Sequence, residues 1–386
     1  MPEKSNNALL WAIGVLLIAL GFVYFSVTGG AGASLKIGVL TPLTGDEASY
    51  GTAMQRAYDL AVSEVNAAGG VNGKKIELVY EDSKCEGNAA ATAAQKLVEV
   101  DGVEFILGGT CSGETLAAAP TTQQAHVLLL SPSATSPDIT QAGDLVFRTY
   151  PSDDREAKLV AAYAQSVNLQ RAAIISQTTD FAQGVRAAFK ASYSGTVVFD
   201  ETFDSGETDF RALITKMRVS NPQMVYVIPQ SPAAGELILQ QLSESWMNVA
   251  VFADNAMLDR SAIAANPSLY EEVVMAEVAL PTQGKAASLL AAYEVMYGRA
   301  PEFVAFTASA YDSVFLLAEA LARAGADAQA VADYFNNQVV DWPGALGTFN
   351  FDENGDAEVE LTLMQAIGGE LVPLAAQVEG ILETAK

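Results

Sequence analysis

Residues 103–131, VEFILGGTCSGETLAAAPTTQQAHVLLLS, carry the pattern that decides the fold. A short apolar run, VEFILGG (103–109), is followed by an alanine-rich segment with a helical pattern and by a second apolar run, VLLLS (127–131). Two such runs separated by a helix are typical of a strand–helix–strand crossover, in which parallel strands are buried on both faces. This stretch therefore predicts a parallel sheet that is covered by helices.

The same unit recurs along the chain at intervals of about 25 to 35 residues. Strand patterns precede it at LKIGVLT (35–41) and KIELVYED (75–82), with helical patterns after each. A polar stretch at 152–155 separates this series from a second set of strand patterns, RAAIISQ (171–177), TVVFDETF (196–203), QMVYVIPQ (223–230) and VAVFADN (249–255). The sequence therefore predicts an α/β fold with two doubly wound parallel-sheet lobes and a ligand cleft between their strand ends.

Two loops at the predicted strand ends are rich in hydroxyl groups. The segment GGTCSGET (108–115) matches the phosphate-binding pattern except that Glu114 replaces its lysine, and a carboxylate would repel a phosphate. Ser112 and the free N–H groups at the start of the following helix suit a smaller anion such as a carboxylate, although a simple helix cap is the alternative. The loop SPSATSPD (131–138), after the next strand, adds hydroxyls to the same place.

Composition excludes several classes of protein. The chain has 386 residues and a net charge of −25, so a nucleic-acid binder, which needs a basic face, is excluded. One histidine and two cysteines cannot build a metal site from several histidine or cysteine ligands. We therefore expect no metal, no cofactor and no nucleic-acid partner.

The first 34 residues indicate targeting rather than folding. Residues 8–27 form an uncharged run of 20 residues, the length of a helix that spans a bilayer. Lys4 precedes the run and the next basic residue is Lys36, which places the rest of the chain outside the cytoplasm. Two outcomes stay open: residues 8–27 anchor the protein at the extracytoplasmic face of the cytoplasmic membrane, or cleavage after Ala33 leaves a secreted or periplasmic protein. We expect membrane contact only through this segment.

The predicted export of the chain also determines what is expected of its two cysteines, Cys85 and Cys111. In an exported protein a pair of cysteines is typically oxidised, so a disulfide is expected. Two buried free thiols are the alternative.

Four blocks of the sequence resemble a known family. They occur in the family's order and spacing and are KIGVLTPLTGDEASYG (36–51), AVSEVNAAGGVNGKKIELVYEDSKCEGNAA (61–90), FILGGTCSGET (105–115) and LLLSPSATSPDIT (128–140). The chain resembles the periplasmic-type (type I) substrate-binding proteins of ABC importers for branched-chain amino acids, the Leu/Ile/Val-binding proteins. The resemblance runs from about Leu35 to the C-terminus and implies a disulfide between Cys85 and Cys111.

The resemblance also implies ligand contacts in the first lobe. The family's carboxylate-binding serine falls on Ser112, and the contacts of the hydroxyl loop fall on Ser133, Ala134 and Thr135. Tyr50 matches a family tyrosine that closes over the ligand.

In the second lobe the chain departs from the family pattern. Phe181 stands where the family usually has a tyrosine, and Gln230 stands near an aromatic position. The acidic residue that pairs with a ligand ammonium should follow the strand VAVF, where either Asp254 or Asn255 can occupy the place. We expect Asp254, because only it supplies a charge.

The family's connectivity implies that the chain crosses between the lobes three times. Hinge crossings are expected near residues 149–152, 278–281 and 346–348. The expected division is residues 35–150 plus 281–346 for the first lobe and residues 151–280 plus 347–386 for the second lobe.

These observations together imply a binding function. The chain is expected to capture an amino acid, branched-chain or related, or a short amide, by lobe closure and to deliver it to an ABC transporter permease. A membrane-anchored sensor of such ligands with the same fold is the alternative. We do not expect an enzyme, because a Ser112 nucleophile needs a base and the single histidine, His126, lies 14 residues away at the far end of the next strand.

Overall fold

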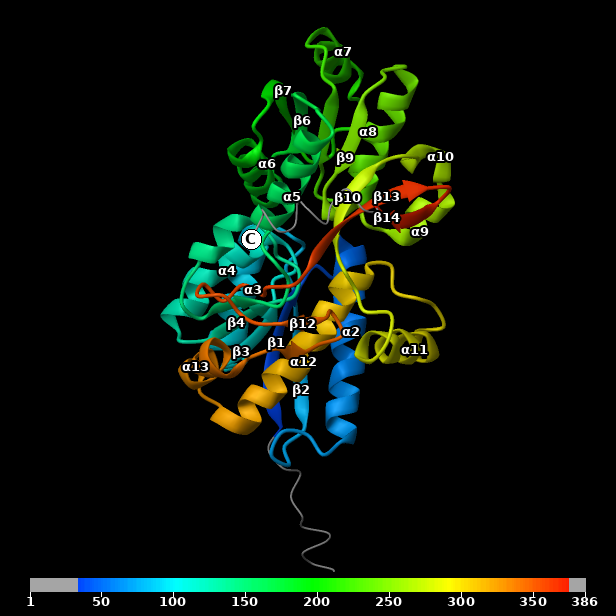
Figure 1. The fold of residues 1–386 in the computed structure, drawn as a ribbon. Helices are drawn as coiled ribbons and strands as arrows, with labels where there is room; N and C mark the ends of the chain where they lie inside the picture. Colours follow the sequence, from blue (N-terminus) through cyan, green and yellow to red (C-terminus); the bar gives the residue numbers. More distant parts are fainter. Residues whose placement is uncertain (1–33, 375–386) are drawn as a thin grey trace, which may run out of the picture.

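The computed structural model describes residues 34–374 as two α/β lobes stacked end to end (Figure 1). The run 8–27 and Ala33 lie outside these residues, so the anchor and the signal peptide stay predictions.

The first lobe contains a five-stranded sheet of order β2-β1-β3-β4-β5, in which all neighbours are parallel. Its strands are β1 (Leu35–Thr41), β2 (Ile76–Asp82), β3 (Phe105–Gly108), β4 (Leu128–Ser131) and β5 (Val146–Arg148). The elements that connect them are α2 (Ala48–Ala67), α3 (Gly87–Glu99), α4 (Ser112–Gln124) and the short 3-10 helix η1 (Pro137–Gln141).

The second lobe contains a seven-stranded sheet of order β14-β13-β10-β9-β8-β6-β7. Its strands are β6 (Arg171–Gln177), β7 (Thr196–Phe203), β8 (Met224–Ile228), β9 (Ala250–Ala253), β10 (Val274–Val278), β13 (Leu361–Ile367) and β14 (Glu370–Pro373). Its helices are α5 (Asp153–Ser166), α6 (Asp180–Ser192), α7 (Arg211–Val219), α8 (Pro232–Glu244), η2 (Asn255–Met257), α9 (Arg260–Ala265) and α10 (Pro267–Tyr270). The last two strands run antiparallel, which the sequence did not predict.

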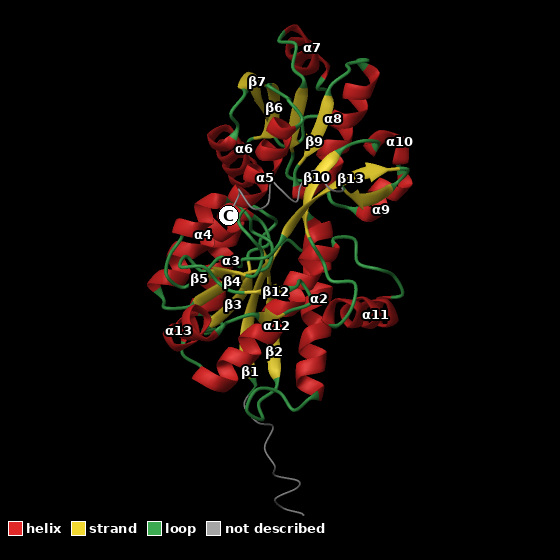
Figure 2. Ribbon diagram, in the orientation of Figure 1, coloured by secondary structure: helices red, strands yellow, loops and turns green. Residues whose placement is uncertain are grey.

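Alternation along the strands explains why their sequences are apolar throughout. In β3, Phe105 and Leu107 pack on one side of the sheet against a core that includes α2 and α12, whereas Ile106 packs on the other side against α3 and α4. In β6, Ile174 and Ile175 divide in the same way between two cores. Helices therefore cover both faces of each sheet, which confirms the predicted doubly wound α/β fold (Figure 2).

After β10 the chain returns to the first lobe. There it forms α11 (Lys285–Tyr297), α12 (Val304–Ala324), α13 (Ala328–Gln338), β11 (Trp342–Pro343) and β12 (Thr348–Phe349). Among the described residues, α12 alone is long and apolar enough to cross a membrane, but most of its apolar stretch is buried. It packs against α2 and serves as a core helix of the first lobe.

The third crossing between the lobes was predicted wrongly. Residues expected in the second lobe from position 347 pack on the first lobe, where Phe351 contacts Phe147 and Phe335. Asp356 forms an ion pair with Arg148 at the end of β5. The chain therefore enters the second sheet only at β13, and we propose that the crossing lies near residues 358–360. We propose that the other two crossings lie at 149–152, between β5 and α5, and at 279–284, between β10 and α11.

Candidate functional site

A cavity lies between the two lobes. It is lined by groups from both lobes: Tyr50, Thr110, Cys111, Ser112, Ser133, Thr135 and Phe306 from the first, and Phe181, Gln230, Asn255 and Ala256 from the second. No lining side chain carries a formal charge. The cavity therefore has a hydroxyl-rich side, an aromatic side and an amide side.

The hydroxyl-rich side is built where β3 and β4 end. Ser112 opens α4, so the first N–H groups of that helix, which have no partner within it, lie beside the cavity. The Ser112 hydroxyl oxygen accepts a hydrogen bond from the Ser136 N–H at 3.1 Å, which leaves its own hydrogen free to donate. The Ser133 hydroxyl instead donates to the Thr110 carbonyl at 2.9 Å and so holds the two loops together.

Arg148 fixes the hydroxyl loop from behind. Its guanidinium is fully buried and donates to the carbonyl oxygens of Ala134, at 3.2 Å, and Ser136, at 2.8 Å. Its Nε and Nη2 atoms donate to the two carboxylate oxygens of Asp356 at 2.5 and 2.7 Å. A bidentate buried pair thus sets the position of the loop that carries Ser133 and Thr135.

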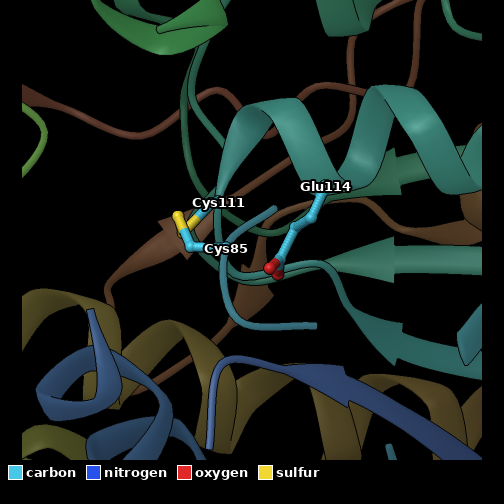
Figure 3. Close-up of side chains that lie close together, drawn as sticks. All are labelled: Cys85, Cys111 and Glu114. Carbon is cyan, nitrogen blue, oxygen red and sulfur yellow. A yellow bond between two sulfur atoms is a disulfide. The ribbon is translucent and has the colours of Figure 1, made fainter. Parts of the chain in front are cut away.

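The predicted disulfide is present at the edge of the cavity. Figure 3 shows Cys85 bonded to Cys111 next to Glu114. The Glu114 carboxylate accepts hydrogen bonds from the Ser83 hydroxyl and the Thr110 N–H, and burial raises its pKa to about 7. Because the sulfur atoms are bonded to each other, these three neighbours do not form a metal site.

Removal of this disulfide should destabilise the fold. We expect Cys85→Ala combined with Cys111→Ala to lower the free energy of unfolding by about 3 kcal/mol, because the bond restricts the unfolded chain over a loop of this length. Urea denaturation of the variant and the oxidised parent measures the difference. A loss below about 1 kcal/mol would contradict this entropic account.

The aromatic side of the cavity is centred on Tyr50. The ring stacks on Phe303 with centroids 4.3 Å apart and meets Phe306 edge-on. Its hydroxyl crosses to the second lobe and donates to the Ala256 carbonyl at 2.6 Å. Burial raises the Tyr50 pKa well above its ordinary value, so the hydroxyl stays protonated as a donor.

The amide side differs from the sequence prediction by one residue. Asp254, expected to face the ligand, is fully buried outside the cavity lining, and its Oδ1 caps η2 by accepting the Ala256 N–H at 2.9 Å. Asn255 lines the cavity instead. The turn of η2 therefore presents the Asn255 side chain, and not the Asp254 side chain, to the cavity.

The structure brings together six of the eight predicted ligand-binding residues. They are Tyr50, Ser112, Ser133, Thr135, Phe181 and Gln230. Ala134 and Asp254 do not line the cavity.

Sequence reasoning missed other lining residues. Thr110 and Cys111 belong to the loop 108–115, and their position directly after β3 could have indicated that they line the cavity. Phe306 comes from α12, far along the chain. No local signal marked it.

Comparison with known proteins identifies the family. A family profile described as "Periplasmic binding protein" matches residues 34–370. The chain belongs to this family. An amino acid binding protein of Pseudomonas aeruginosa is 30% identical over 361 residues, which cover 91% of this chain and 94% of the relative. A leucine-, isoleucine-, valine-, threonine- and alanine-binding protein of the same organism is 31% identical over 92% of this chain and 94% of the relative.

A solved structure agrees with this assignment. The branched-chain amino acid transporter substrate binding protein LivJ from Streptococcus pneumoniae, in complex with isoleucine, is 30% identical with a TM-score of 0.79. The match covers 88% of this chain and 99% of LivJ. The family profile and the fold of LivJ therefore agree that this chain is a periplasmic binding protein, as the sequence predicted.

Proposed function

We propose that this periplasmic binding protein captures an amino acid with an apolar side chain, and first of all a branched-chain amino acid, in the interlobe cavity and delivers it to an ABC permease. The relatives named above bind such amino acids, and the cavity has a polar and an aromatic side. The family is extracytoplasmic, and we propose that residues 8–27 hold the protein at the outer face of the membrane.

The hydroxyl-rich side supports recognition of the ligand carboxylate. Ser112 has a free hydroxyl hydrogen, and the start of α4 offers N–H groups and the positive end of a helix dipole. The observation that carries the proposal is this uncharged anion site, which shares one cavity with aromatic side chains. An apolar ligand side chain would pack on Tyr50, Phe181 and Phe306.

Contacts between the lobes support capture by closure. Tyr50 donates to Ala256 across the cavity, and beside it the Ser136 hydroxyl donates to the Asp180 carbonyl at 3.3 Å. Both bonds join the first lobe to the second, so rotation of the lobes about the three crossings would break them and open the cavity.

We expect Ser112→Ala and Thr135→Ala each to weaken isoleucine binding about tenfold, because a hydrogen bond to a charged group contributes about 1.5 kcal/mol or more. Isothermal titration of residues 35–386 with isoleucine measures the affinity. Thr92→Ala, an exposed hydroxyl on α3, is the matched control and should bind like the parent. Unchanged affinity in both cavity variants would remove the carboxylate site.

A further inference from the structure

Three carboxyl side chains are buried together behind the amide side of the cavity. Asp153 and Glu156 lie in the first turn of α5, and Asp254 lies at the end of β9. Their exposed fractions are 1%, 2% and 0%. Burial is the largest cause that raises the pKa of each carboxyl, to about 7 for Asp153. Asp153 raises the pKa of Glu156 further, and both raise that of Asp254.

Asn255 connects two of these carboxyls to the cavity. Its Nδ2 donates to Asp153 Oδ1 at 2.8 Å and to Glu156 Oε2 at 2.7 Å, so both amide hydrogens are used. The reverse orientation would place the Asn255 oxygen between two carboxylates, which is unfavourable. The group that Asn255 offers to the cavity is therefore its carbonyl oxygen, an acceptor.

The three carboxyls lack a cationic partner among residues 34–374. None of the ion pairs of the described chain includes Asp153, Glu156 or Asp254. Arg148 lowers the pKa of Asp153 from a distance, but its ion pair is with Asp356. The Oδ2 atom of Asp254 is buried without a hydrogen-bond partner, and the neutral Thr135 hydroxyl lowers the pKa of Asp153 without supplying a positive charge. Ionised carboxyls that are buried without a cationic partner are unfavourable, so a positive charge nearby would stabilise this cluster.

We propose that Asp153 and Glu156 supply, through Asn255, the negative charge that holds a cationic group of the ligand. This inference rests on the proposed function and specifies its polar end: the ligand ammonium donates to the Asn255 carbonyl oxygen, and the two carboxylates behind it balance the charge. Asp153 and Glu156 are positioning residues, since they reach the ligand through Asn255.

The same arrangement couples binding to the release of protons. Below the raised pKa of the empty cluster its carboxyls hold protons, and a bound ammonium favours their ionised form, so protons leave when the ligand enters. Affinity for an ammonium ligand should therefore fall as the pH drops from 8 to 6.

The other titratable or charged groups near the cluster include Tyr50 of α2, Arg148 of β5, Tyr150 of the first crossing, Asp154 and Arg155 of α5, Tyr226 of β8 and Glu277 of β10. Burial raises the pKa of all three tyrosines well above 10. Glu277 is paired with Arg260, and Asp154 is paired with Lys158. The carboxyls of the cluster are thus the groups whose charge changes when the ligand binds between pH 6 and 8.

Two probes that differ only in the amine test the proposal: isoleucine, and 3-methylpentanoate, which has the same carbon chain without the amino group. Titration calorimetry at pH 8 should show that Glu156→Gln and Asp153→Asn each weaken isoleucine binding at least tenfold but change 3-methylpentanoate binding less than threefold. For the parent, isoleucine affinity should fall several-fold at pH 6, with a buffer-dependent enthalpy that reports proton release, whereas the analogue should show neither effect.

Asp312→Asn is the matched control. Asp312 is also a buried carboxyl, but it accepts the N–H groups of Ala345 and Leu346 away from the cavity. It should leave the ratio of the two affinities unchanged. Thermal melting at pH 8 checks folding, and Glu156→Gln should melt at or above the parent, because it removes a buried charge.

The possible failures are distinguishable. If the parent binds isoleucine and both cluster variants keep the parent's ratio of affinities, the role of Asp153 and Glu156 is overturned and the proposed function stands. If the parent binds the analogue as tightly as isoleucine, the cationic group is overturned. If the parent binds neither probe, the proposed function falls and this inference falls with it.

Discussion

Arg148→Met should lower the free energy of unfolding by about 3 to 5 kcal/mol, since it leaves the Asp356 carboxylate buried without its partner. Equilibrium unfolding in urea measures the loss. The same change should weaken isoleucine binding at least tenfold, because the carbonyl oxygens of Ala134 and Ser136 lose the donor that positions the hydroxyl loop.

An exposed arginine provides the comparison. Arg171 donates to the carbonyl oxygens of Ser220 and Asn221 at the start of β6, and Arg171→Met should cost less than about 1 kcal/mol. If Arg148→Met lowers the free energy of unfolding as little as Arg171→Met does, the bidentate pair with Asp356 does not hold the loop.

Gly184→Val should reduce isoleucine affinity at least a hundredfold without unfolding either lobe. A Cβ atom at Gly184, on α6, would overlap the Ser136 hydroxyl of the opposite lobe and lie 3.0 Å from Pro137 Cδ. The lobes would then be unable to approach one another as closely, and the hydrogen bonds that span the cavity would not form. Titration calorimetry measures the affinity.

Ala187→Val, on the exposed side of the same helix, controls for the effect of a valine on α6 and should bind like the parent. Small-angle scattering with isoleucine should show a larger radius for Gly184→Val than for the control. Equal radii and equal affinities would mean that closure tolerates the extra methyl groups.

The fold was largely predictable because its strands are short apolar runs buried on both faces. The run LKIGVLT became β1 with the same bounds, and VEFILGG became β3 over Phe105–Gly108. The antiparallel strands β13 and β14 were not predicted, because the pattern of apolar runs joined by helices indicates only parallel neighbours.

The site residues at strand ends were predictable from the sequence. The prediction failed where a tight turn determines which side chain faces the cavity. Ser112, Ser133 and Thr135 lie at the carboxyl ends of neighbouring parallel strands, a position that topology alone fixes. Asp254 was expected in the cavity because it carries a charge, but its carboxylate caps the turn that presents Asn255. Sequence alone does not show which of two adjacent side chains a 3-10 turn directs inward.

The burial of these acidic side chains could not be predicted from local sequence patterns either. Asp153 belongs to the polar stretch 152–155 that separates the two sets of strand patterns, and its contact with Asn255 of η2 forms only in the folded chain. Likewise, the third crossing was misplaced because Arg148 and Asp356 are 208 residues apart in sequence.

The bond from Tyr50 to the Ala256 carbonyl has a consequence for how ligand preference can evolve. This contact joins two parts of the protein and involves no ligand atom, so its energy is common to every compound that the closed cavity admits. Loss of the Tyr50 hydroxyl alone, as in Tyr50→Phe, should therefore scale all affinities by one factor, whereas changes at Phe181, Gln230 or Asn255 should reorder them. The hydroxyl of Tyr50 thus governs overall affinity, and the side chains that line the cavity govern which ligand is preferred.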